Sequence, residues 1–218
     1  MATLHPLFTP SQQADFEASG FVSLGQVVPP SLLQAMRDRL DALMLGDVAH
    51  EGMSFQLDLG VGSDGVASMA ETTVGLSEPS LAHRRVNDLE LDEVFGDYIR
   101  LELFEAIAAH YYRGAEAVSV FRAFMMNKPP EQGTPLGWHQ DVGEGWGIDS
   151  LPVMTVWMAL DAATVESGAM QLVCGSHRRG VISAGHFADE GTMAQFHEED
   201  IVDLECEVRN RIFRAILQ

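Results

Sequence analysis

The strongest constraint on the fold is a change in the spacing of apolar residues near residue 113. Before this point apolar residues recur three or four positions apart, which is typical of amphipathic helices. After it they alternate with polar residues or form short runs bounded by turn-forming residues, which is typical of strands. Helices followed by consecutive antiparallel strands favour an α+β fold in which helices flank a jelly-roll barrel. We therefore predict a single domain, with a helical flank and lid over 1–112, a β core over 113–207 and a divergent tail over 208–218.

The first helix is predicted from its start signal. Thr9 suits the N-cap position, Pro10 the first helical position and Gln12 the return bond of a capping box. We expect this helix to end near Gly20, because glycine commonly follows the last helical residue. A short strand is expected over 21–24.

Ser31 and Gln34 form a second capping-box pattern, which predicts a helix that stops before Gly46. Residues 46–80 are rich in Gly, Ser and acidic residues and only weakly periodic, so we expect a long excursion that serves as a lid. The apolar stripe of the predicted helix indicates core packing and consists of Leu32, Leu33, Met36, Leu40, Leu43 and Met44.

Another helix is expected over 88–112, with Gly114 at its C-terminal cap. Its predicted inward-facing residues are Leu91, Phe95, Tyr98, Ile99, Leu103, Phe104 and Ile107. The predicted strands of the β core are 118–126, 153–160, 169–174 and 201–206, and the predicted turns are 128–135 and 164–168.

Composition excludes several classes of protein. The 218 residues are 46% hydrophobic and 21% charged, so the chain can bury a sizeable core. The net charge of −19 disfavours nucleic acid and anionic lipid as partners. The sequence has no run of about 18 apolar residues, which a membrane span would need, and its N-terminus has no signal-peptide pattern. We therefore expect a cytoplasmic protein. Cys174 and Cys206, the only cysteines, are expected to be reduced thiols.

The chemistry is predicted from the motif His139-Gln140-Asp141, which follows a predicted turn. On a strand, residues two apart project from the same face, so His139 and Asp141 can reach one point. One imidazole and one carboxylate are the first two ligands of a facial triad, which leaves positions on a ferrous ion open for a co-substrate and oxygen. The alternative is a surface histidine near a solvated aspartate.

The region around this motif resembles the phytanoyl-CoA dioxygenase family over roughly residues 9–207. Members are Fe(II)- and 2-oxoglutarate-dependent oxygenases on a double-stranded β-helix. The resemblance implies hydroxylase-type oxidation of a small organic or acyl substrate, with ascorbate as a possible support. The segments that carry it, in the family's order, are Asn127-Lys128-Pro129-Pro130, His139-Gln140-Asp141, Trp157 to Thr164, Ser167 to Gln171 and Gly175-Ser176-His177.

The resemblance also assigns roles to individual residues. His139 and Asp141 match the family's iron ligands. Arg85 falls where the family places a basic side chain against 2-oxoglutarate, and a guanidinium offers a carboxylate a bidentate fork. The alternative for Arg85 is a solvated charge paired with Asp88.

Three further residues are implied to line the co-substrate pocket. Trp157 matches a family tryptophan beside 2-oxoglutarate, although a core aromatic on a central strand would look the same. Phe124 and Gln140 align with other positions of that pocket.

The C-terminal part departs from the family pattern. The family has a second histidine ligand on a later strand and an arginine about ten residues beyond it. No histidine follows the segment 202–207, and Arg209, Arg211 and Arg214 come without the preceding histidine, so none of them is assigned to the co-substrate. His177, His186 and His197 are the alternative third ligands downstream of the motif. The tail over 208–218 is compatible with a short amphipathic helix, but the abrupt loss of the strand pattern favours a truncated or misjoined end. We therefore expect the last strands of the double-stranded β-helix to be missing.

These observations predict a non-haem iron, 2-oxoglutarate-dependent dioxygenase whose turnover is negligible without the third ligand and the arginine. Two alternatives stay open. One is a catalytically inactive fragment or binding module of the same fold. The other is a cupin-type metal protein, although such sites usually have more histidine ligands than this stretch offers.

Overall fold

Helix α1 (Pro10–Ser19) begins and ends where the sequence predicts. The computed structural model describes residues 8–64, 67–130, 133–142, 154–182 and 187–205, together with the backbone of 214–217. The Gln12 backbone N–H donates to the Thr9 hydroxyl at 3.3 Å, and the Thr9 backbone N–H donates to Gln12 Oε1 at 2.9 Å, which completes the capping box. Gly20 closes the helix at φ +83°, and strand β1 (Phe21–Ser23) follows.

Helix α2 (Pro30–Leu45) confirms the predicted stripe, because Met36, Leu40, Leu43 and Met44 are buried. The predicted capping box at Ser31 is wrong. Pro29 is the N-cap residue and has no side-chain cap bond, so the helix starts one residue before Ser31. The fixed φ of Pro30 suits the first helical position and explains this earlier start.

The long irregular excursion expected over 46–80 is wrong for much of this segment, whereas its expected role as a lid stays a prediction. The structure has strands β2 (Ser54–Val61), β3 (Ala67–Met69) and β4 (Thr73–Val74) there. The pairing of β2 with β5 shifts register between Gln56 and Leu57, and the buried positions change from Phe55 to Asp58 and Gly60. Such a bulge interrupts the alternation of buried and exposed residues from which a strand is predicted, so the sequence does not predict this strand.

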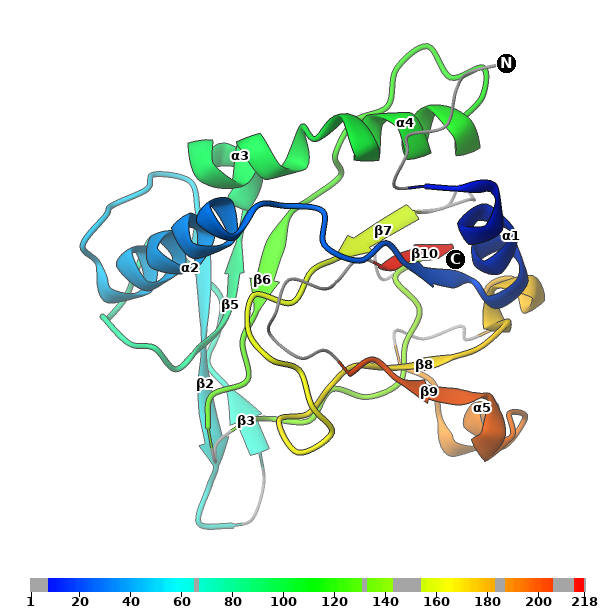
Figure 1. Cartoon of the computed structure of the whole chain (residues 1–218). Helices are drawn as coiled ribbons and strands as arrows, with labels where there is room; N and C mark the ends of the chain where they lie inside the picture. Colours follow the sequence, from blue (N-terminus) through cyan, green and yellow to red (C-terminus); the bar gives the residue numbers. More distant parts are fainter. Residues whose placement is uncertain are drawn as a thin grey trace. The chain divides into compact units, whose positions relative to one another are not determined.

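The chain divides into two compact units, each built from segments on both sides of residue 112. One unit contains Val28–Phe104 and Gly114–Pro135. Its antiparallel sheet has the order β3-β2-β5-β6, with β4 also paired to β2; Figure 1 shows β5 (His83–Asn87) between β2 and β6 (Phe124–Met126). Phe55, Val86 and Met125 lie opposite one another in register and form the buried face.

The helix expected over 88–112 is interrupted. The structure has a 3-10 helix η1 (Leu89–Leu91) and helices α3 (Glu93–Ile99) and α4 (Glu102–Tyr111), with a break at Arg100 and Leu101. Most of the predicted apolar stripe is nevertheless buried, namely Phe95, Leu103, Phe104 and Ile107. Leu91 is 53% exposed, against the prediction.

The other unit contains Met1–Val27, Glu105–Arg113 and Leu136–Gln218. Its antiparallel sheet has the order β1-β10-β7, and Figure 1 shows β10 (Arg214–Leu217) between β1 and β7 (Met154–Trp157). Strands β8 (Gln171–Val173) and β9 (Ile201–Asp203) form an antiparallel pair. The short helices are η3 (Ser176–Arg179), α5 (Glu190–Met193) and η4 (Glu198–Asp200).

Strand β10 corrects the expectation for the tail. Residues 214–217 pair with both β1 and β7, so the alternative of an amphipathic helix is wrong for them; the rest of the predicted tail lies outside the described residues. The predicted mixture of helices and antiparallel strands is confirmed, although several strands are shorter than expected. Among the described helices, none has the length and apolar content that crossing a membrane requires.

A buried charge cluster joins β2, β5 and residue 134 in the unit that contains Val28–Phe104 and Gly114–Pro135. Asp58 and Arg84 are buried and form an ion pair at 3.2 Å. The Thr134 N–H and hydroxyl donate to the two Asp58 oxygens at 2.9 and 2.8 Å, and Arg84 also donates to the Thr134 carbonyl. Burial by itself raises the pKa of Asp58, but hydrogen bonds from Thr134, Gly60 and Arg84 lower it below its usual value.

We predict that Asp58→Asn lowers the free energy of unfolding by about 3–5 kcal/mol, because it leaves the Arg84 charge buried without its counter-charge. The double variant Asp58→Asn/Arg84→Met should lose less than the sum of the two single losses. Urea denaturation measures both. Asp97→Asn is the matched control, because its ion pair with Arg100 is 3.8 Å long and mostly exposed. A loss for Asp58→Asn no larger than that of the control would contradict the role of the cluster.

Candidate metal centre

His139 and Asp141 converge in the unit that contains both chain ends. His139 Nε2 lies 3.3 Å from Asp141 Oδ1, and the two side chains are 22% and 23% exposed. His139 forms a β-bridge with Phe187, which keeps this part of the chain extended. Residues two apart on an extended chain project to the same side, so the backbone explains the convergence.

The His139 ring is oriented by its own backbone. Its Nδ1 lies 2.8 Å from the Gly137 carbonyl oxygen, which can only accept, so Nδ1 carries the proton. In the neutral ring, Nε2 then has a lone pair that faces the Asp141 carboxylate. His139 Nε2 and Asp141 Oδ1 are then two acceptor atoms 3.3 Å apart, and a cation between them, either a metal ion or a second ring proton, stabilises this arrangement.

The donor pair fits a divalent metal. Two adjacent ligands, each about 2.1 Å from an octahedral metal, are themselves about 3 Å apart. The observed separation of 3.3 Å is close to this value. The edge of the Phe187 ring packs on the imidazole with 5.9 Å between ring centroids and further restricts its rotation.

No third His, Cys, Asp or Glu side chain completes a metal-binding group within the described ranges. His177 donates from Nε2 to the Glu17 carbonyl at 3.1 Å, and its Nδ1 faces Gly20 so closely that a Cβ there would lie 2.4 Å away. His197 is exposed at the start of η4. His186 lies outside the described residues.

Gln140 lies between the two donors in sequence, and its amide is bonded to the backbone. Its Nε2 donates to the Gly180 carbonyl at 3.0 Å, and its Oε1 accepts from the Ile182 N–H at 2.9 Å. The side chain therefore joins the HxD segment to the chain that follows η3. Sequence reasoning missed this role, because a side chain bonded to a distant backbone leaves no local pattern.

The turn at 175–178 contacts the end of α1, which the sequence also did not reveal. Gly175 N–H donates to the Ser19 carbonyl at 2.8 Å, and Arg178 donates to the Ala18 carbonyl at 2.6 Å. With the His177 bond to Glu17, three consecutive carbonyls at the helix end are satisfied. The Gly-Ser-His motif therefore caps a helix about 160 residues earlier in the chain.

The other predicted pocket residues occupy two places. Trp157 lies on β7 opposite Arg214 of β10. Arg85 and Phe124 lie together in the other unit, where the guanidinium carbon is 4.0 Å from the centre of the phenyl ring. Arg85 pairs with Gln56 and Met126 on the face opposite the buried Val86.

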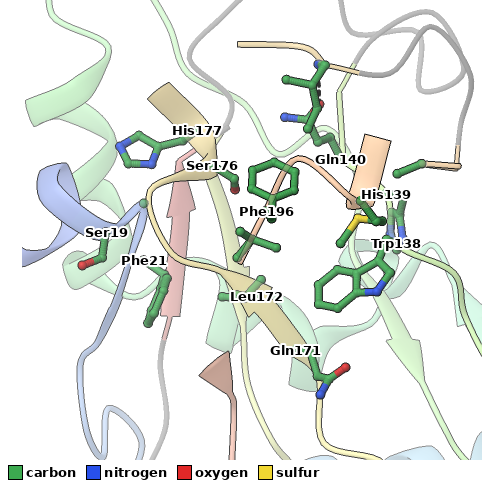
Figure 2. Close-up of a pocket in the computed structure, with 15 residues that line it drawn as sticks. Ser19, Phe21, Trp138, His139, Gln140, Gln171, Leu172, Ser176, His177 and Phe196 are labelled. Atoms are coloured by element: carbon green, nitrogen blue, oxygen red, sulfur yellow. Dashed lines mark hydrogen bonds between the residues drawn. The ribbon is translucent and has the colours of Figure 1, made fainter. Parts of the chain in front are cut away.

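A pocket adjoins His139, one of the two proposed metal ligands. Its wall includes Gly20, Phe21, His139, Gln140 and residues of β8 and η3. Figure 2 shows Trp138 beside His139, with Leu172 and Phe196 among the side chains that surround the space. Trp157 is not among the residues of this wall.

Comparisons with known proteins place these features in a family. A family model described as phytanoyl-CoA dioxygenase matches residues 16–208. AviO1 from Streptomyces viridochromogenes Tue57 has a similar solved structure, with a TM-score of 0.62 and 18% identity over 100% of this chain and 86% of that chain. EvdO2 from Micromonospora carbonacea var. aurantiaca is similar at a TM-score of 0.58 and 18% identity, over 99% and 86%.

A structure of EvdO2 complexed with 2-oxoglutarate matches at a TM-score of 0.57 and 19% identity, over 99% of this chain and 86% of that chain. Likeness at this level of identity shows a shared fold. A search of curated proteins found no match. The family model, however, spans most of the sequence, and the chain therefore belongs to the phytanoyl-CoA dioxygenase family.

Proposed function

We propose that this protein is an Fe(II)- and 2-oxoglutarate-dependent dioxygenase that hydroxylates a small organic or acyl substrate. The observation that carries the proposal is the 3.3 Å approach of His139 Nε2 and Asp141 Oδ1 in a chain of this family. The double-stranded β-helix of the family is the fold that we infer for the strands. The complex of a structural neighbour with 2-oxoglutarate supports the choice of co-substrate.

In this proposal His139 and Asp141 hold the ferrous ion. Iron and 2-oxoglutarate together supply oxidising chemistry that protein side chains lack. The bond from Nδ1 to the Gly137 carbonyl leaves Nε2 as the ligand atom and fixes the ring plane. The Gln140 amide, bonded to Gly180 and Ile182, keeps the segment between the ligands in place.

Arg85 is the residue that we propose for binding a carboxylate of 2-oxoglutarate. Its guanidinium is a planar fork with donors suited to a carboxylate, and stacking on Phe124 restricts its orientation. A charge-assisted hydrogen bond between this guanidinium and a carboxylate of 2-oxoglutarate would contribute about 1.5–3 kcal/mol to binding. Phe124, Gln140 and Trp157 are further residues that the sequence predicts for binding the co-substrate, and each of these assignments stays a proposal.

The second candidate function is a member of the same family that binds without turnover. The donor set favours it, since the described part of the chain offers only His139 and Asp141 to a metal and no third carboxylate, thiolate or imidazole beside them. A site with two protein ligands holds a metal less tightly and restrains a chelating co-substrate less well than a facial triad.

We predict that His139→Ala and Asp141→Ala each weaken Fe(II) binding by at least about 10–100-fold, because each removes a ligand and even the loss of a group that orients a ligand costs that much. Anaerobic calorimetric titration of the full chain measures the affinity. His197→Ala is the matched control, since this imidazole is exposed at the start of η4 and should not affect the affinity. Unchanged binding by both ligand variants would exclude this pair as the metal site.

Succinate formation separates the two candidate functions. If the chain is a dioxygenase, then with Fe(II), 2-oxoglutarate and ascorbate the wild type releases succinate faster than His139→Ala, because the variant has lost one of the two proposed metal ligands. Succinate is measured by chromatography after a fixed time. Equal rates in a wild type that binds iron would match the negligible turnover predicted from the sequence and would establish the second candidate.

A further inference from the structure

The pocket beside His139 has a mostly apolar wall. Phe21, Trp138, Leu172, Ile182, Met193 and Phe196 contribute aromatic rings, aliphatic groups and a thioether. Figure 2 shows Phe196 and Leu172 at the space and Trp138 next to His139. A group bound here therefore contacts apolar surface and lies next to one of the two proposed metal ligands.

Most polar side chains of the wall are already bonded within the protein. The Gln140 amide is bonded to Gly180 and Ile182, and His177 Nε2 donates to the Glu17 carbonyl. Gln171 Nε2 donates to Asp203 Oδ1 at 2.7 Å. Both ends of the Gln140 amide are bonded, so a ligand would have to displace one of these bonds to gain a hydrogen bond from it, and this reduces the advantage of a strongly polar ligand.

Within the described residues, neither Lys nor Arg belongs to the pocket wall. The Arg179 guanidinium stacks on the Phe196 ring, with its carbon 4.5 Å from the ring centre, but Arg179 itself does not line the pocket. The sequence has no Lys or Arg between Pro129 and His177, a stretch that includes both metal-ligand candidates and several acidic residues. The net charge of −19 adds a negative field that repels polyanions and leaves a neutral molecule unaffected.

We propose that this pocket binds an uncharged, largely apolar portion of the substrate, and that the substrate is a neutral small molecule rather than a coenzyme A thioester. This inference rests on the proposed function, because only an enzyme would use the bound molecule as its substrate. A coenzyme A thioester carries several phosphate charges, which proteins bind with Arg, Lys or helix N-termini. Aromatic and aliphatic walls instead favour an alkyl or ring group through burial of apolar surface.

The test compares 2-naphthol, a neutral aromatic probe, with hexanoyl-CoA in calorimetric titrations of the full chain. We expect 2-naphthol to bind and hexanoyl-CoA to show no binding over the same concentration range. Leu172→Glu should weaken 2-naphthol binding about tenfold or more, because it places a carboxylate in the apolar wall. Leu81→Glu is the matched control, since Leu81 is 52% exposed and outside the pocket.

Phe196→Ala is a second variant that should fold if Leu172→Glu does not, and it should also weaken 2-naphthol binding, by severalfold. Binding of hexanoyl-CoA as tight as that of 2-naphthol, or an unchanged 2-naphthol affinity in a folded Leu172→Glu or Phe196→Ala variant, would overturn the inference. Asp141→Ala, whose side chain is not part of the pocket wall, should bind iron more weakly and still bind 2-naphthol. Iron binding without 2-naphthol binding would therefore reject this inference alone, whereas the reverse result would reject the proposed metal site.

Discussion

The isolated β-bridge of His139 is the constraint on which the candidate site depends. It pairs His139 with Phe187, and the Ala188 N–H donates to the Trp138 carbonyl at 2.7 Å, so the backbone is extended at His139. Because side chains alternate along a strand, the imidazole and the carboxylate meet while the intervening amide is directed elsewhere. A helical conformation would direct the two donors to opposite sides, so the metal site requires the extended backbone at the bridge as well as the donors themselves.

The segment from Gly175 to Ile182 connects the chain around Gln140 to helix α1. At one end, its backbone and side chains satisfy the last carbonyls of α1; at the other, Gly180 and Ile182 bond to the Gln140 amide. Because these hydrogen bonds occupy the Gln140 amide and His177 Nε2, mainly apolar groups are left to contact a molecule in the neighbouring pocket. The polar contacts that position the proposed ligands thus also determine the kind of molecule that the pocket suits.

Local signals in the sequence predicted local structure well. The capping box at Thr9 and the stripe of α2 each depend on residues close in sequence; α1 forms where expected, whereas α2 starts at Pro30, before the predicted cap. The sequence did not predict β2, because a register shift changes its buried face and places the charge of Asp58 inside. Strand β10 was also missed, since its place between β1 and β7 is determined by distant partners rather than by its own pattern. The convergence of His139 and Asp141 followed from strand geometry, whereas the partners of Gln140 and His177 required the tertiary structure.

The central claim is that His139 and Asp141 together bind a ferrous ion. The most direct test is an anomalous difference map at the iron absorption edge, from crystals grown anaerobically with Fe(II) and 2-oxoglutarate. The account predicts one strong peak within about 2.0–2.2 Å of both His139 Nε2 and an Asp141 carboxylate oxygen. A peak bound by other side chains, with His139 Nε2 still directed at Asp141 and no metal between them, would contradict it.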